Sequence, residues 1–350
     1  MTDAERDGER DAKLAAACAH LVGDDVKVEK LSGGYSNITI LVSGSERQVI
    51  VRTPPPGAAH IKSGHDVIRE ARLLDKLHPV YARAPKPLLI VDDASVIGVP
   101  FFAMERVAGR VLRNKVPKDA DTGPATMKAL SQSFVDALAE LHAIDVDKAG
   151  LSSIGKPHGY VQRQVDGWRE RYEKSKTDEV SDMERASLWL RDHVPPASAT
   201  GAQRVTMVHN DFKYDNLVLD VDNLAHVVGV LDWELATVGD PMTDLGTSLA
   251  YWIEENDDDA FRALPLGLTF LPGNLTRREL VERYQDKSGR AVSDLAFHVV
   301  LASFKVATIA QQIYYRYAKG FTQDPRFAAL GFAVAVIGAR AAQIIDDGKI

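Results

Sequence analysis

The first hundred residues show short apolar runs of the kind that form β-strands, together with two helical patterns. One helical pattern covers residues 11–21, and a second at 64–77 carries apolar residues every three or four positions. Runs rich in β-branched residues and bounded by turn formers predict strands. These strands are expected at residues 27–31, 37–42, 48–52, 88–91 and 101–106. We therefore expect a small antiparallel sheet with one inserted helix.

The rest of the chain is dominated by long helical periods. Helices are expected at residues 125–143, 160–176, 183–194, 245–252, 276–285, 296–318 and 327–345. Short apolar runs at 205–208, 217–219 and 227–231 predict strands among them. The last helix is the most apolar, but Arg340, Gln343 and many small residues favour a packed helix over a membrane span.

Together the two patterns predict an α+β fold of two lobes. Residues 1–107 would form the N-terminal lobe, with residues 1–10 frayed because they are polar and mixed in charge. Residues 108–350 would form a larger, mainly helical lobe, joined through a hinge near 105–109. A chain of 350 residues is long enough for two such lobes.

Composition narrows the class of protein. Hydrophobic residues make up 45% of the chain and charged residues 26%, as in ordinary globular proteins. The formal net charge of −7 argues against nucleic acid as the main partner. Cys18 is the single cysteine, so neither a disulfide framework nor a cysteine-based metal cluster is expected. The N-terminus lacks the apolar run of a signal peptide, and we expect a soluble, cytoplasmic protein with no membrane partner.

Residues that could carry chemistry are concentrated where two of the predicted strands end. Asp211 and Asn216 lie on the loop after one strand, and Asp232 ends another. Asp211 could accept the proton of a hydroxyl, and Lys213 could reach a γ-phosphate. The oxygens of Asn216 and Asp232 are of the hard type that Mg²⁺ prefers. Asp and Asn are also common turn formers, but their placement at two strand ends favours a kinase-like phosphotransferase.

These motifs resemble those of the aminoglycoside phosphotransferase family, which has the protein-kinase-like fold. The first motif runs His209-Asn-Asp-Phe-Lys-Tyr-Asp-Asn216, and the second runs Leu231-Asp-Trp-Glu234. Further matching stretches are 33–37, 49–52, 54–57, Glu70, 98–105 and 239–245. Within the family the match is to the kinase-like domain found fused to, or beside, acyl-CoA dehydrogenases. The resemblance covers nearly all of residues 26–345, and it implies a functional link to such dehydrogenases.

The resemblance implies the catalytic and metal-binding roles. Asp211 would be the catalytic acid/base, and Asn216 and Asp232 would hold Mg²⁺, so ATP and Mg²⁺ are the expected cofactors. His209 is interpreted as structural. Asp244 is expected either to organise the loop around His209 and Asp211 or to cap the next helix.

The resemblance also implies the nucleotide-binding positions. Ser36 and Asn37, at the tip of a glycine-containing loop, would cover the phosphates through backbone N–H groups and side chains. The backbone of Glu105 and Val107 would pair with the adenine.

Arg52 is expected to reach the α- and β-phosphates and to pair with Glu70. The broader family usually has Lys at this position, and a planar guanidinium is not equivalent to an ammonium. Arg at this position resembles what is usual in the dehydrogenase-associated subgroup. It also leaves open an enzyme of low activity or none.

Two charge clusters could line the cleft for the phosphate acceptor. A basic cluster lies on the helix expected at 160–176, and an acidic cluster follows the helix expected at 245–252. Their members are Arg163, Arg169, Arg171, Lys174 and Lys176, and Glu254, Glu255, Asp257, Asp258 and Asp259. A basic cleft would suit a phosphorylated or CoA-linked acceptor, and an acidic one a polycationic aminoglycoside. Since either cluster could instead be a solvated surface, the sequence leaves the acceptor open.

The leading hypothesis is an ATP- and Mg²⁺-dependent O-phosphotransferase that acts on a hydroxyl of a small molecule. The subgroup resemblance favours a hydroxyacyl-type acceptor. The alternatives are an aminoglycoside-type antibiotic phosphotransferase and a nucleotide-binding pseudokinase that regulates a partner enzyme. Arg52 is the only sequence support for the pseudokinase. A protein kinase is disfavoured because residues 232–244 are too few for a long activation segment.

Overall fold

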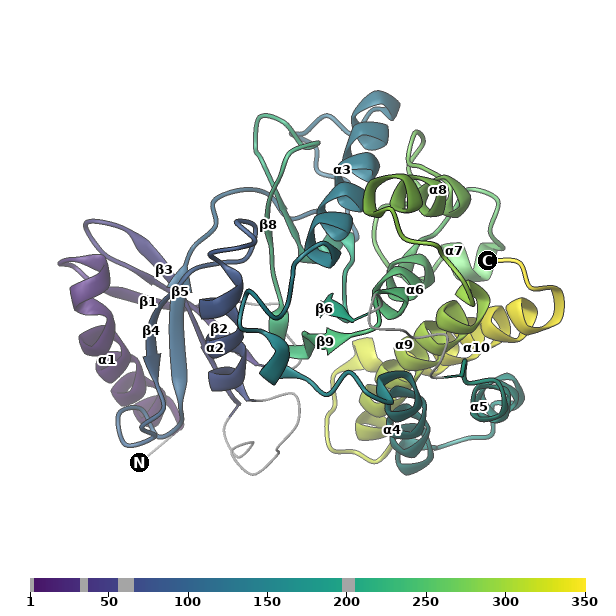
Figure 1. The fold of residues 1–350 in the computed structure, drawn as a ribbon. Helices are drawn as coiled ribbons and strands as arrows, with labels where there is room; N and C mark the ends of the chain where they lie inside the picture. The colour runs from purple at the N-terminus through teal and green to yellow at the C-terminus, as the bar shows by residue number, and fades with distance from the viewer. Residues whose placement is uncertain (1–2, 32–36, 56–65, 197–204) are drawn as a thin grey trace.

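The computed structural model describes residues 3–31, 37–55, 66–196 and 205–350 (Figure 1). The N-terminal part is a five-stranded antiparallel sheet in the order β1-β2-β3-β5-β4. Its strands are β1 (Lys27–Lys30), β2 (Ile38–Ser43), β3 (Gln48–Thr53), β4 (Pro87–Val91) and β5 (Phe101–Glu105). Helix α1 (Asp3–Val22) packs on one face of this sheet and α2 (Val67–Leu77) on the other.

Successive side chains of a strand point to opposite faces of the sheet, so each face carries apolar residues that a helix can cover. In β5, Phe101 and Ala103 join the apolar cluster of α1, whereas Phe102 and Met104 join the cluster that contains α2 and the helical part. Cys18 of α1 is fully buried in the first cluster, and burial raises the pKa of its thiol to about 11. Such a thiol is a packing residue rather than a nucleophile.

The C-terminal part is mainly helical and is built around α9. Its helices are α3 (Pro124–His142), α4 (Tyr160–Ser175), α5 (Ser181–Asp192), α6 (Pro241–Tyr251), α7 (Asp259–Arg262), α8 (Arg277–Ser288), α9 (Leu295–Ala318) and α10 (Leu330–Asp347). Helices α4, α5, α6 and α10 all contact α9, while α8 packs on α3. Two short antiparallel pairs carry the functional loops: β6 (Thr206–Val208) with β9 (Thr237–Gly239), and β7 (Leu217–Leu219) with β8 (Val227–Val230).

Most predicted elements are present, with ends shifted by about a turn or less. Helix α1 begins at Asp3, well before the start at residue 11 that the sequence predicts, and the expectation that residues 1–10 are frayed stays a prediction. Ala, Glu and Arg are good helix formers, and Glu9 pairs with Lys13 one turn later at 2.8 Å. Strand β9 and helix α7 have no counterpart among the predicted elements, because Thr237-Val-Gly239 and Asp259-Ala-Phe-Arg262 show neither a period nor the apolar run by which β6, β7 and β8 are predicted.

Two helical segments are long and apolar enough to cross a membrane by length and composition alone. They are Leu295–Ala318, with 72% of its apolar window buried, and Pro325–Asp347, with 33% buried. The first is the central helix α9. The second contains α10, which packs along α9 and α5. Both segments therefore have packing partners within the protein.

Candidate active site

The two loops that carry the predicted chemistry each contain a residue in the left-handed backbone region. Asn210, two residues past β6, has φ +66°, and Asp232, two residues past β8, has φ +67°. Asn and Asp tolerate this region better than most residues. The side chain of Asn210 is fixed from both ends. Its Oδ1 accepts a hydrogen bond from the Tyr160 hydroxyl at 2.7 Å, and its Nδ2 donates to the Leu235 carbonyl at 3.0 Å.

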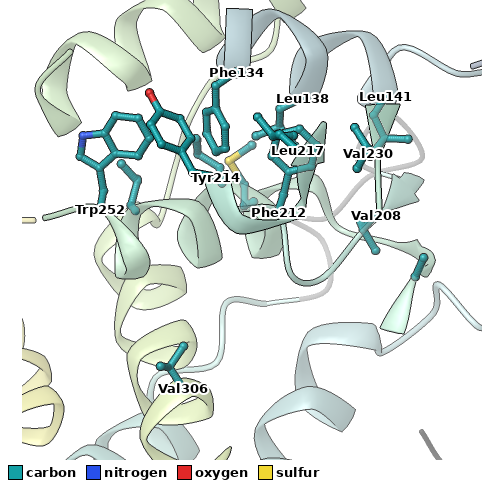
Figure 2. Packing of buried hydrophobic residues seen from close by; sticks show 14 of the residues in the cluster. Phe134, Leu138, Leu141, Val208, Phe212, Tyr214, Leu217, Val230, Trp252 and Val306 are labelled. Carbon is teal, nitrogen blue, oxygen red and sulfur yellow. The ribbon is translucent and has the colours of Figure 1, made fainter. Parts of the chain in front are cut away.

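Side chains alternate between core and solvent along residues 211–216. The even-numbered side chains are buried, and the odd-numbered ones are partly exposed. Phe212 packs against Phe134 of α3, with 4.9 Å between ring centroids, and Tyr214 lies 5.1 Å from Trp252 (Figure 2). The aromatic anchors therefore hold the backbone, so that the polar side chains between them point away from the core.

Asp211 lies among cations. Its Oδ2 is 3.0 Å from Nζ of Lys213 and accepts a hydrogen bond from Nδ2 of Asn216 at 3.1 Å. Lys305 of α9 is buried nearby and donates to the carbonyl of Asn210. Burial alone would raise the pKa of the Asp211 carboxyl, but Lys213 and Lys305 outweigh it and hold the pKa below its usual value. Asp211 is therefore a carboxylate at neutral pH.

Tyr251 covers the other side of Lys213. The ammonium lies 4.5 Å from the centre of the Tyr251 ring, which is cation–π distance. Burial and the neighbouring Asp211 carboxylate raise the pKa of the Tyr251 phenol, so its hydroxyl keeps its proton. The Lys213 side chain is thus held between a carboxylate and a ring.

Asp244 organises the loop from within the core, as one of the two predictions states. It is fully buried in α6, and its two oxygens accept from the backbone N–H groups of His209, at 2.6 Å, and Asn210. The alternative that Asp244 caps its helix is wrong. Helix α6 begins one turn earlier, because Pro241 can occupy the first helical position and Asp240 caps the helix by accepting a backbone N–H.

His209 is structural, as predicted. Its Nδ1 accepts from the backbone N–H of Asp211 at 3.2 Å, so Nε2 carries the proton and donates to the Leu231 carbonyl at 2.9 Å. The ring also packs edge-on against Trp233, at 4.7 Å between centroids. His209 therefore ties the loop of Asp211 to the segment of Asp232.

Arg52 of β3 binds three carboxylates. Its Nε lies 3.4 Å from Glu70, its Nη1 3.1 Å from Asp232 and its Nη2 2.9 Å from Glu234. The predicted ion pair between Arg52 and Glu70 is confirmed. Burial would lower the pKa of the guanidinium, but the three carboxylates raise it above its usual value. Burial raises the pKa of the Glu70 carboxyl to about 7, although Arg52 opposes this.

Asn216 and Asp232 lie on directly paired segments. The N–H of Leu231 donates to the carbonyl of Asn216 at 2.8 Å. An amide oxygen and a carboxylate suit Mg²⁺, which usually takes waters and phosphate oxygens as its other ligands. In the part of the chain that the structure describes, no group of three or more His, Cys, Asp or Glu could hold a metal ion. The donor set therefore fits an ion that is bound together with a nucleotide.

The phosphate-covering positions are only partly described. Asn37 is buried, and its Nδ2 donates to Oε2 of Glu234 at 2.8 Å, the same oxygen that Arg52 contacts. Ser36 lies outside the described residues. The roles of both toward a nucleotide stay predictions.

Of the two positions expected to pair with adenine, Glu105 is the last residue of β5 and Val107 lies two residues past it. The N–H of Glu105 donates to the Lys86 carbonyl at 2.9 Å, so pairing with a base would have to use the Glu105 carbonyl. Val107 packs on β8 of the helical part, since a Cβ on Gly229 would lie 2.8 Å from Val107 Cγ1. This segment thus runs between the two parts of the molecule.

The acidic cluster proposed as a cleft is only partly internal: Glu255, Asp258 and Asp259 are exposed, whereas Glu254 and Asp257 are partly buried. Glu254 lies 3.3 Å from Arg277, and Asp257 forms a second ion pair with the same guanidinium. Arg277 is buried, and Asp258 caps the short helix α7. These carboxylates therefore join α6, α7 and α8 rather than lining a cleft.

The basic cluster divides between two surroundings. Arg163 and Arg171 line a cavity beside Asn210. The other members are bonded elsewhere: Arg169 to Ser187, Lys174 to Glu170, and Lys176 to Glu184.

Three residues near the predicted site were given no role in the sequence analysis: Glu234, Tyr251 and Lys305. Lys305 carries a usable signal, because a lone cation in the middle of an apolar helix needs a polar partner. Glu234 lies within the second motif, but Arg52 is 182 positions away, so the sequence does not reveal their contact. Nothing in the sequence distinguishes Tyr251 from other tyrosines that pack in the core.

The comparison by sequence and the comparison by structure both match this chain to phosphotransferases. The model of a family described as the phosphotransferase enzyme family matches residues 27–280. Acyl-CoA dehydrogenase family member 11 of Rattus norvegicus is 33% identical over 302 residues, which are 84% of this chain and 37% of that protein. Member 10 of Mus musculus is 32% identical over 291 residues, 82% of this chain and 26% of that protein. The chain thus spans only about a third of the length of these relatives.

Solved structures confirm the predicted protein-kinase-like fold. A Ralstonia eutropha protein provisionally described as an aminoglycoside phosphotransferase has a TM-score of 0.76 and 28% identity, with 95% of this chain and 98% of that chain covered. Choline kinase from Cryptosporidium parvum has a TM-score of 0.64 over 96% of both chains, at 12% identity. The second likeness establishes the fold alone.

Proposed function

The chain belongs to the phosphotransferase enzyme family, and on that premise we propose that it transfers the γ-phosphate of ATP to a hydroxyl of a small molecule. One observation carries this proposal. The ionised Asp211 lies against Lys213 and Asn216 on one loop, and Asp232 lies on the segment paired with it. Phosphoryl transfer needs positioned charges more than covalent chemistry, and these are the charges it needs.

Asp211 would act on the acceptor. Its carboxylate accepts the hydroxyl proton as the oxygen bonds to the γ-phosphorus, while the bond from that phosphorus to the β-phosphate oxygen breaks and ADP leaves. Lys213, fixed by Asp211 and Tyr251, supplies a positive charge next to the transferred group. Asn216 and Asp232 would hold Mg²⁺, whose chemistry is to neutralise charge on the phosphate oxygens.

The relatives direct the choice of acceptor. They are named acyl-CoA dehydrogenase family members, which favours a hydroxyacyl-type molecule over an antibiotic. The pairing of Glu254 and Asp257 with Arg277 also weakens the feature that would have favoured a polycationic aminoglycoside.

The test is an ADP-release screen with hydroxyacyl-CoAs, hydroxyacids, aminoglycosides and choline-like alcohols. On the acceptor found, Asp211→Asn is expected to lower kcat by roughly 10²- to 10⁴-fold, the usual contribution of a positioned base. The matched control is Asp222→Asn, which removes an exposed carboxyl on the turn after β7 and should leave kcat unchanged. An Asp211→Asn protein with full turnover would sink the proposal.

A pseudokinase that binds nucleotide and regulates a partner is the second candidate. The observation in its favour is that Arg52 already pairs with Asp232, one of the proposed Mg²⁺ ligands. Titration with Mg²⁺ and ATP separates the candidates. Binding without ADP release on any acceptor of the screen supports the pseudokinase, and turnover excludes it.

A further inference from the structure

A cavity of about 460 Å³ lies beside the catalytic loop, between that loop, α4, β9 and α9. Its lining includes Lys156, Arg163, Trp168, Arg171, Asn210 and Lys305. Asn210 directly precedes Asp211 in the chain, and Lys305 is close enough to Asp211 to help lower its pKa. One end of the cavity is therefore next to Asp211, the residue proposed to activate a hydroxyl, although Asp211 itself is not part of the lining.

The lining carries four cations and no Asp or Glu. Lys156 and Arg163 are exposed at the mouth, Arg171 is half-buried, and Lys305 is buried at the floor. Among the described residues, none of the four forms an ion pair with a carboxylate. The positive charges thus become more buried from the mouth of the cavity toward the catalytic loop, where the carboxylates of Asp211 and Asp244 partly offset the charge of Lys305.

The contacts that these cations do make hold them in place without neutralising them. Arg163 donates to the backbone carbonyls of His158 and Lys156. Lys305 donates to the Asn210 carbonyl. Carbonyl oxygens orient a guanidinium or an ammonium but bring no negative charge, so these groups keep their attraction for an anion.

Two other cations on and just after α4 differ from these four, because they form ion pairs with carboxylates. Lys174 of α4 lies 2.5 Å from Glu170, and Lys176, just past the helix, lies 2.5 Å from Glu184. Lys174 and Lys176, which do not line the cavity, are paired with carboxylates, and Arg169 bonds to the Ser187 hydroxyl, whereas Arg163 and Arg171 line the cavity and form no ion pair within the described part of the chain.

An aromatic surface lies among the cations. Trp168 is half-buried, its Nε1 donates to Gln164 at 3.2 Å, and the Arg171 guanidinium lies 4.8 Å from the centre of its ring. Lys305 lies 5.8 Å from the same ring. An apolar chain could therefore lie along the indole while an acidic group at its end meets the arginines.

We propose that this cavity is the acceptor site and that it selects a hydroxylated molecule with an acidic group, a phosphate or a carboxylate, at the far end from the hydroxyl. The inference rests on the proposed function, since it assigns the acceptor of that reaction. The acidic group binds Arg163 and Arg171, the apolar part lies on Trp168, and the hydroxyl reaches Asp211. A polycationic acceptor is repelled from the same cavity.

The kinetic test compares three acceptors of similar length that differ in charge: 4-hydroxybutyrate, 1,4-butanediol and 4-amino-1-butanol. The double variant R163Q/R171Q is expected to lose roughly tenfold or more in kcat/KM with 4-hydroxybutyrate, because charge-assisted hydrogen bonds are lost. The diol should be affected little, and KM for ATP should not change.

The control R169Q removes an arginine of the same helix that bonds to Ser187 outside the cavity, and it should behave as wild type. Equal losses with the acid and the diol, or a preference of the wild-type protein for the amine, would overturn the inference.

A binding test is independent of turnover. Saturation-transfer-difference NMR with butyl phosphate, butyrate and butanol, in the presence of Mg²⁺ and ADP, measures affinity for probes that cannot be phosphorylated. Both anions should bind the wild-type and R169Q proteins more tightly than butanol does, and R163Q/R171Q should lose that preference. The tighter anion identifies phosphate or carboxylate as the group recognised.

If the anions bind in this way but no acceptor is phosphorylated, the anion site stands and the proposed function fails. If no anion binds but acceptors are phosphorylated, the proposed function stands and the anion site fails.

Discussion

At the scale of single residues, the neighbours of Asp211 decide its chemistry. A carboxyl placed this deep would tend to protonate, and only the two ammonium groups beside it keep it charged. Lys213 and Lys305 come from different elements, one from the same loop and one from α9. The loop sequence therefore supplies the base, and the fold supplies half of the charge that keeps it ionised.

Replacing Lys213 by Met tests this dependence. Without the ammonium, the pKa of the Asp211 carboxyl should rise, because burial then acts against fewer opposing charges. Asp211 is active when ionised, so the acidic limb of the profile of kcat/KM against pH should move to higher pH. Lys213→Arg keeps the charge and should leave that limb near its wild-type position. An acidic limb that does not move in Lys213→Met would show that Asp211 is not the group that titrates.

At the scale of elements, the patterns that could be predicted from sequence are those with a period. Helices α3, α4 and α9 and the five strands of the sheet are long enough for one. Strand β9, Thr237-Val-Gly239, has neither a period nor an apolar run, yet it pairs with β6 and brings Thr237 to the cavity wall. The position of Asp211 could be read from its motif, whereas its partners Tyr251 and Lys305 could not. Those contacts depend on how helices pack, which local sequence does not record.

Helix α3 supports the catalytic loop, and Phe134 is the side chain that does so. Its ring contacts Phe212, Tyr214 and Trp252 at centroid distances of 4.9 to 5.4 Å. Phe134→Ala is expected to lower the free energy of unfolding by about 3–5 kcal/mol, measured by denaturant titration. It should also lower kcat under conditions where the protein is still folded, because the loop loses its support.

The control for this substitution is Phe332→Ala on α10. That side chain is 58% exposed, so its removal should change the free energy of unfolding by no more than about 0.5 kcal/mol. Similar losses in the two variants would contradict the assigned role of Phe134.

At the scale of the whole molecule, several contacts between the sheet side and the helical part converge on one short segment. Arg52 and Asn37 bind the Glu234 side chain, and Arg69 donates to the carbonyls of Glu234, at 3.4 Å, and Ala236, at 2.6 Å. Three residues from the sheet and α2 thus converge on residues 234–236. Any movement of one part relative to the other has to break or carry these bonds.

Glu234→Gln should loosen this junction. Arg52 keeps Glu70 and Asp232, so the loss in the free energy of unfolding should be only about 1–3 kcal/mol. Hydrogen–deuterium exchange should increase in β3 and α2 while the core of α9 stays protected, and KM for ATP should rise. Glu255→Gln, an exposed carboxyl of the same type, is the matched control. Exchange in α2 that equals that of the control would exclude Glu234 as the junction.

The alternation along residues 211–216 separates two kinds of evolutionary change. A substitution at Phe212 or Tyr214 alters the packing of the interior, so selection for folded protein acts on it directly. A substitution at Lys213 or Asp215, which are partly exposed, alters the charge at the proposed phosphate site and disturbs the packing of the interior less. A lineage can therefore retune or abolish the reaction through the odd-numbered positions while the scaffold stays intact. In this architecture, enzymes and inactive relatives can be neighbours in sequence space.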